Sequence, residues 1–515
     1  MRLFLFLVGG TGSRVMRPLI MQLAAGITPL NESGLPIATE IVPIIIDPHR
    51  SNEDLKRTEN LLKWYRHIHR SLYGDGDGND NVQGFFSVKI SSLKDIVPNS
   101  PTLSDTFLFN IDAVGSKTFQ EFISYNTLDS ANQALCSMMF SKTQLETKMN
   151  IGFVGNPNIG SVALNKIKDS EEFRQFASVF QRDDRIFIVS SIFGGTGAAG
   201  YPIIVNNIRN ARNSNQANRG DLADAKIGAL TVLPYFNVQQ DENSPISRAD
   251  FISKTKSALY YYHDNLTGIK HDSNDVQESK INACYYLGDE IPSTPYFNDP
   301  GNNGQRNDAH IVEFIGALSI LDFLQIPDDQ LITSDGKAIN PIYKEYGLAY
   351  DKKQISLMDL GMQSRLFINK QMIKFHIAYM YITNHLKKDI GHGYTLDKPE
   401  ITNAFLSTSF YTTITANFYV AYNQWLKELK ENQRSFVPFN LNTDNLKDCI
   451  TDIQPKSGFL KSPLDYKKIL SAMNSASQKA VKASRFGTND VPQKLFCLLN
   501  ETLDKLIEEK YISVI

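Results

Sequence analysis

The feature that most constrains the fold is an apolar run that leads directly into a glycine-rich turn and a helix. Residues 184–189 form a short run that is apolar and mostly β-branched from Ile186 onward, which is typical of a buried strand. The turn follows at 190–202, and the apolar spacing of 203–209 suits a helix. Glycine lets backbone N–H groups approach a phosphate closely, and a helix start adds free donors and a partial positive charge. The pattern therefore predicts an anion site.

Two further glycine loops lie in the first 200 residues. One follows the strand-like run 2–7 and spans 8–13, and the other spans 155–160. A single glycine turn is weak evidence, because ordinary strand-to-helix turns also use glycine. Three loops together predict a polyphosphate that is held from several sides. The candidate nucleotide-binding residues in them are Gly9, Gly10, Thr11, Gly12, Ser13, Gly155, Asn156, Pro157, Gly194, Gly195, Thr196, Gly197 and Ala198. We expect a valine at Gly195 to fill the phosphate space.

At these loops the chain resembles the tubulin/FtsZ superfamily, over residues 1–325. The signature loop of that family reads Gly-Gly-Gly-Thr-Gly-(Ser/Thr)-Gly after a strand, and residues 194–197 match its centre. The loop at 155–160 is similar to the FtsZ loop Gly-Ala-Asn-Pro-x-x-Gly, and the order and spacing of the two loops agree. Together the two loops are far more specific than either alone.

Three departures make the chain a divergent prokaryotic member if the resemblance holds. Phe193 stands at the first signature glycine, Ala198 at the Ser/Thr position and Ala199 at the next glycine. Backbone donors survive these changes, but one hydroxyl is lost. The resemblance implies a cytoplasmic protein that binds GTP or GDP with Mg²⁺. It also implies head-to-tail filaments with GTP hydrolysis completed at the subunit contact, and an adaptor of unidentified kind.

The fold class that we expect is α/β, with a parallel sheet and helices on both faces, because strands and helices alternate along the first half of the chain. Residues 307–324 are apolar almost all round, which indicates a buried helix, and the family has such a helix between its two domains. We therefore divide the chain into a nucleotide-binding domain, 1–325, and a C-terminal domain, 326–515. The second domain is expected to be mainly helical, with helices at 356–388, 399–432, 463–485 and 490–510.

Polar residues beyond the glycine loops have two interpretations each. Asp47 ends a strand, where it either makes a turn or approaches the ribose or a hydrated cation, as the FtsZ counterpart does. Asn307 and Asp308 either cap the core helix or, as in FtsZ, read the guanine edge, since a carboxylate can accept two N–H bonds from guanine. Arg14 and Arg17 follow the first loop and face either phosphates or solvent.

Catalysis has the weakest sequence support. The family places an Asn-x-Asp-x-x-Asp loop after the buried helix, where it enters the neighbouring subunit and activates water. At that place this chain has Asp328 and Asp329 without the full motif. They are either the catalytic carboxylates or an exposed acidic turn.

Composition narrows the remaining function classes. The 515-residue chain has a net charge of -2, which predicts no broad surface for nucleic acid. Its 4 cysteines lie far apart without metal-ligand or redox spacing, which fits a reducing compartment. It has no run of 18 apolar residues, so we expect no membrane segment.

Two alternatives to a filament-forming GTPase stay open. The altered signature loop and the missing acidic motif favour a nucleotide-binding scaffold without hydrolysis. A Rossmann-type dinucleotide-dependent enzyme gains some support from residues 8–13 and from the placement of Asp47. Its Gly-x-Gly-x-x-Gly motif fails, however, because Val15 stands where the third glycine belongs.

Overall fold

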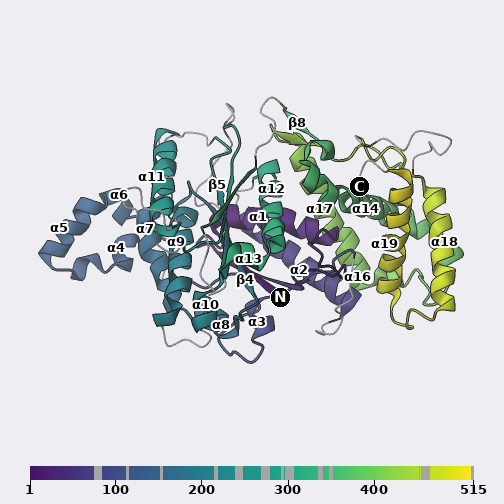
Figure 1. Cartoon of the computed structure of the whole chain (residues 1–515), viewed down its shortest axis with the longest axis horizontal. Coiled ribbons are helices and arrows are strands. Elements are labelled where there is room, and N and C mark those ends of the chain that lie inside the picture. Colours follow the sequence, from purple (N-terminus) through teal and green to yellow (C-terminus); the bar gives the residue numbers. More distant parts are fainter. Residues whose placement is uncertain are drawn as a thin grey trace.

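The computed structural model describes residues 1–74, 84–111, 115–150, 153, 155–213, 219–237, 248–267, 279–291, 295, 307–333, 340–346, 352–451, 453 and 464–511. Within these ranges a seven-stranded sheet, parallel throughout, forms the centre of the molecule (Figure 1), with the strand order β3-β2-β1-β4-β5-β6-β7. Its strands are β1 (Arg2–Val8), β2 (Glu40–Ile46), β3 (Lys89–Ile90), β4 (Arg185–Ser191), β5 (Lys226–Val232), β6 (Ala283–Leu287) and β7 (Ile342–Tyr346). The expected α/β class is confirmed.

The strands in the middle of the sheet are continuous apolar runs because both sheet faces are covered. All residues of β4 and β5 are buried. β1 lies between β2 and β4, with Phe6 in register with Ile44 on one side and with Ile188 on the other. The predicted strand before the glycine turn at 190–202 is therefore a central strand of the sheet.

Helices cover both faces of the sheet (Figure 1). On one face α1 (Gly9–Ala24) packs with α2 (Glu53–Tyr73) and α12 (Ile311–Gln325), and on the other α9 (Gly195–Arg209) packs with α7 (Pro157–Leu164) and α11 (Arg248–Leu266). The shorter helices of the N-terminal part are α3 (Leu93–Ile96), α4 (Phe119–Phe122), α5 (Ser130–Met139), α6 (Lys142–Leu145), α8 (Glu171–Val179), α10 (Arg219–Ala223) and α13 (Asp328–Leu331). The arrangement is the doubly wound one that the alternation predicts.

The expected buried helix exists, but it begins at Ile311 and not at residue 307. His310 is its N-cap, because the imidazole accepts the N–H of Val312 at 3.1 Å and Glu313 completes a capping box. A Cβ atom on Gly316 would lie 3.0 Å from Leu230 of β5 and 3.5 Å from Val15 of α1. The helix is therefore wedged between the sheet and α1, which explains its apolar surface.

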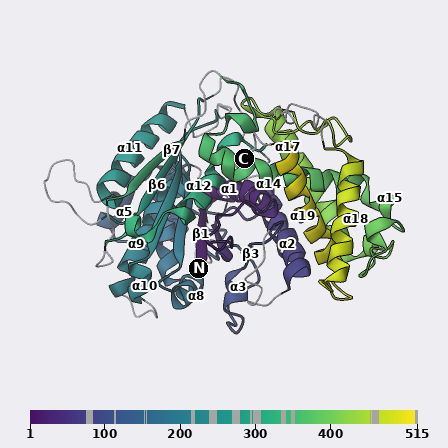
Figure 2. The same cartoon turned by 45° about the vertical axis from the view of Figure 1, so that its right-hand side comes forward.

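The C-terminal region is mainly helical, as predicted, and lies on the side of the sheet that carries α1 and α2 (Figure 2). The expected segments correspond to α14 (Met362–Asn384), α17 (Tyr419–Glu431), α18 (Tyr466–Lys482) and α19 (Val491–Lys510), with the short helices α15 (Leu386–Asp389) and α16 (Ser409–Thr412) and the strand pair β8 (Gln354–Ile355) and β9 (Ser435–Phe436). The helix expected from residue 399 starts only at Ser409. Phe314 of α12 packs on Trp425 and Phe436, so the core helix contacts both halves of the chain.

Candidate functional site

The glycine loops at 8–13 and 190–202 lie at the place where the strand order of the sheet reverses. From β1 the chain winds outward through β2 to β3, and from β4 it winds the other way to β7. In doubly wound sheets ligands bind beyond the carboxyl ends of the strands at such a switch point. Gly9 follows the end of β1, and Gly194 follows the end of its neighbour β4. The topology thus brings together two loops that the sequence holds far apart.

The glycine loop at 190–202 touches both of the other glycine loops. Gly9 has a φ of +71°, and a Cβ on it would lie 3.3 Å from the Cβ of Thr196. A Cβ on Gly195 would lie 3.0 Å from the backbone nitrogen of Asn156, and one on Gly160 would lie 2.7 Å from the carbonyl oxygen of Gly195. Larger residues at these positions would push the backbones apart, so the contacts account for the glycines.

Three helices begin at this junction, and none of them has a side-chain cap. The N-caps of α1, α7 and α9 are Val8, Asn156 and Gly194, and none makes a capping hydrogen bond. By contrast α2 and α18 are capped by Asn52 and Asp465. The first N–H groups of a helix have no partner inside it, so converging uncapped helix starts favour an anion.

Space for a ligand lies beside two of the glycines. Among the described residues, a Cβ on Gly10 would meet no atom within 4 Å, and a Cβ on Gly194 would meet only the Ser191 hydroxyl, at 3.0 Å. Both residues are half-buried. Thr11, between Gly10 and Gly12, is half-buried as well, whereas Gly12 packs on Leu7 with its Cβ position 2.5 Å from the Leu7 carbonyl carbon. Gly10 and Gly194 therefore border the open part of the junction.

Lys254 of α11 adds a cation that the sequence does not reveal. Its Nζ donates to the carbonyl oxygen of Gly155 at 3.1 Å. The two residues are 99 positions apart, and no local motif connects them. A flexible ammonium beside the third loop is of the type that pairs with a phosphate.

Several of the predicted nucleotide contacts have structural roles in the fold. The Ser13 hydroxyl is buried and donates to the Gly10 carbonyl at 2.9 Å. The Asn156 side-chain oxygen accepts from Gln144 at 3.0 Å. The backbone N–H groups of the loops, and not these side chains, are therefore the candidate donors. Pro157 occupies the first position of α7, where its missing N–H costs no helical hydrogen bond.

Asp47 lies with the glycine loops beyond the carboxyl ends of the strands. It follows β2, whose last residue, Ile46, pairs with Val8, so Asp47 is beside the start of the first loop. Its carboxylate accepts the N–H of His49 at 2.9 Å, which is the turn interpretation of the sequence. Burial raises the pKa of Asp47 to about 6 despite that hydrogen bond. The carboxyl therefore changes its charge close to neutral pH.

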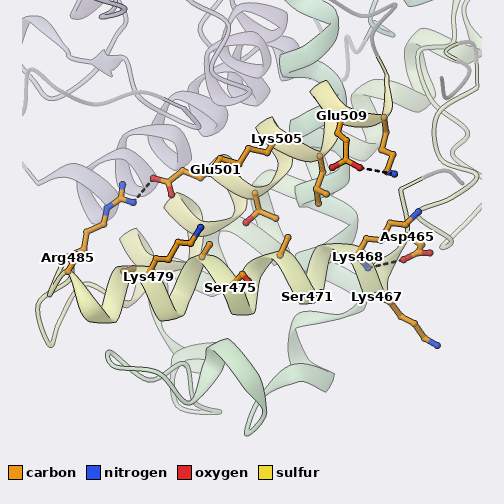
Figure 3. A pocket seen from close by; sticks show the side chains of 17 residues that line it. Asp465, Lys467, Lys468, Ser471, Ser475, Lys479, Arg485, Glu501, Lys505 and Glu509 are labelled. Atoms are coloured by element: carbon orange, nitrogen blue, oxygen red, sulfur yellow. Dashed lines mark hydrogen bonds and ion pairs between the residues drawn. The ribbon is translucent and has the colours of Figure 1, made fainter. Parts of the chain in front are cut away.

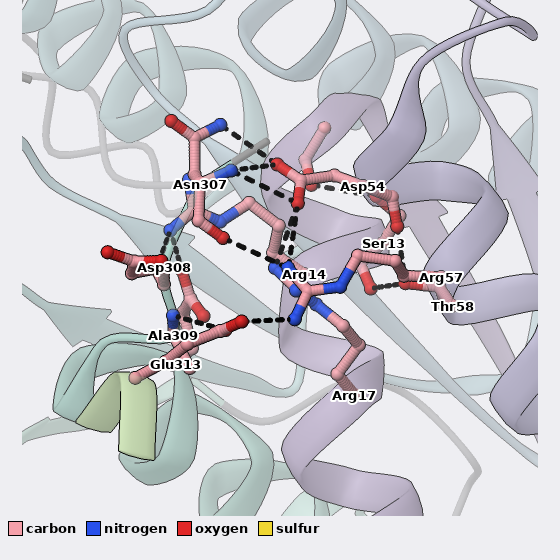
Figure 4. A network of polar contacts seen from close by, with 12 residues as sticks. Ser13, Arg14, Arg17, Asp54, Arg57, Thr58, Asn307, Asp308, Ala309 and Glu313 are labelled. Carbon is pink, nitrogen blue, oxygen red and sulfur yellow. Dashed lines mark hydrogen bonds and ion pairs between the residues drawn. The ribbon is translucent and has the colours of Figure 1, made fainter. Parts of the chain in front are cut away.

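Asn307 and Asp308 lie within a polar network one helical turn beyond the first loop (Figure 4). Since His310 caps α12, the capping interpretation of this pair is wrong. The Asn307 amide donates to Asp54 at 2.8 Å, and Arg14 donates to the Asp308 carbonyl at 3.1 Å. The side chain of Asp308 is exposed, whereas that of Asn307 is held by its hydrogen bond to Asp54 of α2.

The arginines after the glycine loop at 8–13 enter this network, where both lie beside carboxylates. Arg14 pairs with the buried Glu313. Arg17 is buried, and its guanidinium lies 3.5 Å from the carboxylate of Asp54. Its guanidinium nitrogens make no hydrogen bond within the described part of the chain. Burial lowers the pKa of Arg17, although Asp54 opposes this change.

A second pair extends the network to the C-terminal region. Arg57 of α2 pairs with Glu428 of α17 at 2.5 Å, and Glu428 also accepts the N–H of Ala309 at 3.1 Å. The two paired residues are 371 positions apart. The network therefore connects the candidate nucleotide edge to the helical half of the molecule.

Asp328 and Asp329 lie at the opposite end of the strands, where β4 and β5 begin. Asp328 accepts from Arg185 and from Lys226, each at 2.8 Å, and these are the first residues of β4 and β5. The glycine loops follow the other ends of the strands, about 20 Å away for a strand of seven residues. Burial alone would raise the pKa of Asp328, but the hydrogen bonds and charges of Lys226 and Arg185 hold it below its usual value. Asp329 is exposed.

Metal ligands are sparse near the junction. Among the described residues, no group of three or more His, Cys, Asp or Glu side chains could hold an ion. This donor set fits Mg²⁺ only as a companion of ligand phosphates, which is how that ion commonly binds nucleotide sites.

Neither the protein-family models nor the curated proteins contain a match to this chain. Of the helices in the described ranges, none combines the length and apolar character needed to cross a membrane.

Proposed function

We propose that this chain is a tubulin/FtsZ-like protein of the cytoplasm that binds a guanine nucleotide at the junction of its glycine loops. The observation that carries the proposal is that the glycine loop at 190–202 contacts both of the other glycine loops beside the switch point between β1 and β4. Three uncapped helix starts supply backbone donors for the phosphates, and Lys254 adds a positive charge. Mg²⁺ would accompany the phosphates and offset their charge.

Base recognition is assigned to Asp308. Its side chain is exposed and its carbonyl accepts from Arg14 of α1, whereas the amide of Asn307 is bonded to Asp54. A carboxylate accepts two N–H groups from guanine, and adenine lacks that pair. We expect Asp308→Asn to weaken GTP binding by about 1–3 kcal/mol and to leave the triphosphate contribution intact. If GTP and ATP compete equally for the parent protein, the assignment is wrong.

Assembly and hydrolysis are proposed to be linked through a head-to-tail contact. A heterologous contact that does not close a ring produces an open filament. The glycine loops and the pair Asp328 and Asp329 lie at opposite edges of the sheet, so one subunit cannot bring them together. In a head-to-tail filament the acidic edge of one copy would meet the nucleotide edge of the next, and hydrolysis would be completed there.

The scaffold without hydrolysis is the second candidate. It is favoured by the two ion pairs of Asp328, which lower the pKa of this carboxyl and weaken it as a base. Asp329 is then the remaining carboxylate for water activation. A Rossmann-type enzyme shares the strand order and has Asp47 beside the first loop, but Val15 breaks its phosphate motif.

Nucleotide released from the purified protein by denaturation identifies the ligand class. GTP or GDP supports the proposal, and NAD or NADP would support the dinucleotide enzyme. Sedimentation and negative-stain imaging with GTP, a slowly hydrolysed analogue and GDP then test assembly. A protein that stays monomeric with all three, well above micromolar concentration, contradicts the filament. Filaments without phosphate release retain the scaffold and exclude the GTPase.

A further inference from the structure

A groove of about 870 Å³ lies between α18 and α19, far along the chain from the glycine loops (Figure 3). The two helices pack together and are joined by residues 483–490, so they run antiparallel. Figure 1 places them at the side of the C-terminal region that lies away from the sheet. The groove is therefore distinct from the candidate nucleotide site.

Small side chains form the α18 side of the groove. They recur at the three- and four-residue spacing of one helix face: Ser471, Ala472, Ser475, Ala476 and Ala480. On α19, Thr502 and Leu506 line the groove. Side-chain size sets how closely two helices approach, so this face lets a third helix pack at short range.

The lining of the groove is strongly basic. It contains six basic side chains and three acidic ones: Lys467, Lys468, Lys479, Arg485, Lys505, Lys510, Asp465, Glu501 and Glu509. The excess of three positive charges contrasts with the net charge of -2 for the whole chain. This part of the surface therefore selects for negative charge.

The three acidic residues already have partners. Asp465 caps α18 by accepting the backbone N–H of Lys468 at 2.9 Å. Glu501 pairs with Arg485 at 2.5 Å, and Glu509 pairs with Lys510 at 3.0 Å.

Three of the cations remain for an incoming ligand. Lys467, Lys479 and Lys505 are exposed, and none of them forms an ion pair with another side chain in the described ranges. Lys467 and Lys479 lie at opposite ends of α18, and Lys505 lies on α19. Unpaired lysines of both helices therefore lie beside the face of small side chains.

We propose that this groove binds an acidic amphipathic helix of a partner protein. The face of small side chains receives the apolar stripe of that helix, and the three lysines pair with carboxylates along its edges. α18 has 17 residues and is about 25 Å long, so a partner helix of similar length matches the groove. Nucleic acid fits less well, because three carboxylates line the groove and its one arginine is already paired.

Fluorescence anisotropy with the full chain tests the proposal. The probe is a labelled helical peptide of about 18 residues, with an Ala/Leu stripe flanked by glutamates. A second peptide carries lysines in place of the glutamates, and a single-stranded oligonucleotide is the third probe. We expect the glutamate peptide to bind and the lysine peptide not to bind. Lys479→Glu combined with Lys505→Glu should weaken binding about tenfold, and Ala476→Trp should weaken it without any change of charge.

Lys482→Glu is the matched control. It reverses an exposed lysine of α18 that does not line the groove, and it should leave binding unchanged. Absence of binding by the glutamate peptide overturns the proposal, and so do equal binding of both peptides or equal effects of Lys482→Glu and Lys479→Glu. Preferential binding of the oligonucleotide would assign the groove to nucleic acid and would also overturn it. None of these outcomes depends on GTP binding.

Discussion

A Cβ atom on Gly195 would lie 3.0 Å from the backbone nitrogen of Asn156. It would also lie 3.1 Å from the Cβ of Phe153 and 3.2 Å from the nitrogen of Gly155. The first residue of α9 is thus pressed against the third glycine loop and does not point into open space. A larger side chain at Gly195 therefore strains the junction itself, which corrects the expectation that a valine there fills the phosphate space.

Gly195→Ala is accordingly expected to lower the free energy of unfolding by about 1–3 kcal/mol. Gly10→Ala is the matched change, because a Cβ on Gly10 meets no atom of the described ranges within 4 Å. It should change the free energy of unfolding by less than about 0.5 kcal/mol. Urea denaturation of both variants measures the difference. Equal stabilities would mean that the loops are not in contact.

The sequence predicted features that depend on short segments. Strand, glycine turn and helix are local patterns, so the loops around Gly9 and Gly194 and the buried α12 were all predictable. The start of α12 was misplaced because Asn307 and Asp308 are also favourable capping residues, and His310 took that role. The effect of a side chain at Gly195 was not predictable, since it depends on a neighbouring loop.

Long-range partners could not be predicted in the same way. Lys254 and Glu428 reach the candidate nucleotide edge only through tertiary packing, and their own segments carry no motif. The two ion pairs of Asp328 were missed for a similar reason. Arg185 and Lys226 begin two different strands, and only the parallel register brings them to one carboxylate.

Asp47→Asn is expected to change how stability depends on pH. Because the pKa of Asp47 is about 6 in the folded chain and ordinarily 3.8, the folded state holds the proton more tightly. The stabilising contribution is complete below about pH 4 and is lost as the pH rises through 6, a loss of up to about 3 kcal/mol. Asparagine does not ionise and retains an oxygen for the His49 N–H. Relative to the parent, the variant should therefore gain stability between pH 4 and 7; parallel curves would contradict a buried carboxyl.

Asp328→Asn should destabilise the fold by about 1–2 kcal/mol, because Arg185 and Lys226 are buried and lose their charge partner. Asp329→Asn is the control for stability, since that side chain is exposed, and it should leave the thermal midpoint unchanged. If hydrolysis is completed between subunits, Asp329→Asn should still reduce phosphate release from assembled protein. Normal release in this variant would assign water activation elsewhere.

The pair formed by Arg57 and Glu428 is expected to couple α2 to α17. Glu428 is buried and is the nearer carboxylate of Arg57, whose other carboxylate partner, Asp54, lies 3.6 Å away. Glu428→Ala should therefore cost about 2 kcal/mol. A double-mutant cycle with Arg57→Ala should give a coupling energy of about 1–3 kcal/mol. Glu431→Ala, at an exposed position of the same helix, should have little effect. Additive effects of the two changes would show that the pair does not join the two helices.

Titration calorimetry of GTP into the parent protein and into Gly10→Val tests the central claim most directly. Gly10 borders the open part of the loop junction, so valine should leave the fold intact and occupy the space that a phosphate needs. The account predicts that the parent binds GTP in preference to ATP and NAD, and that Gly10→Val binds it at least about 100-fold more weakly, a loss of about 3 kcal/mol. Equal affinity of the two proteins for GTP, or a parent that does not bind GTP, would contradict it.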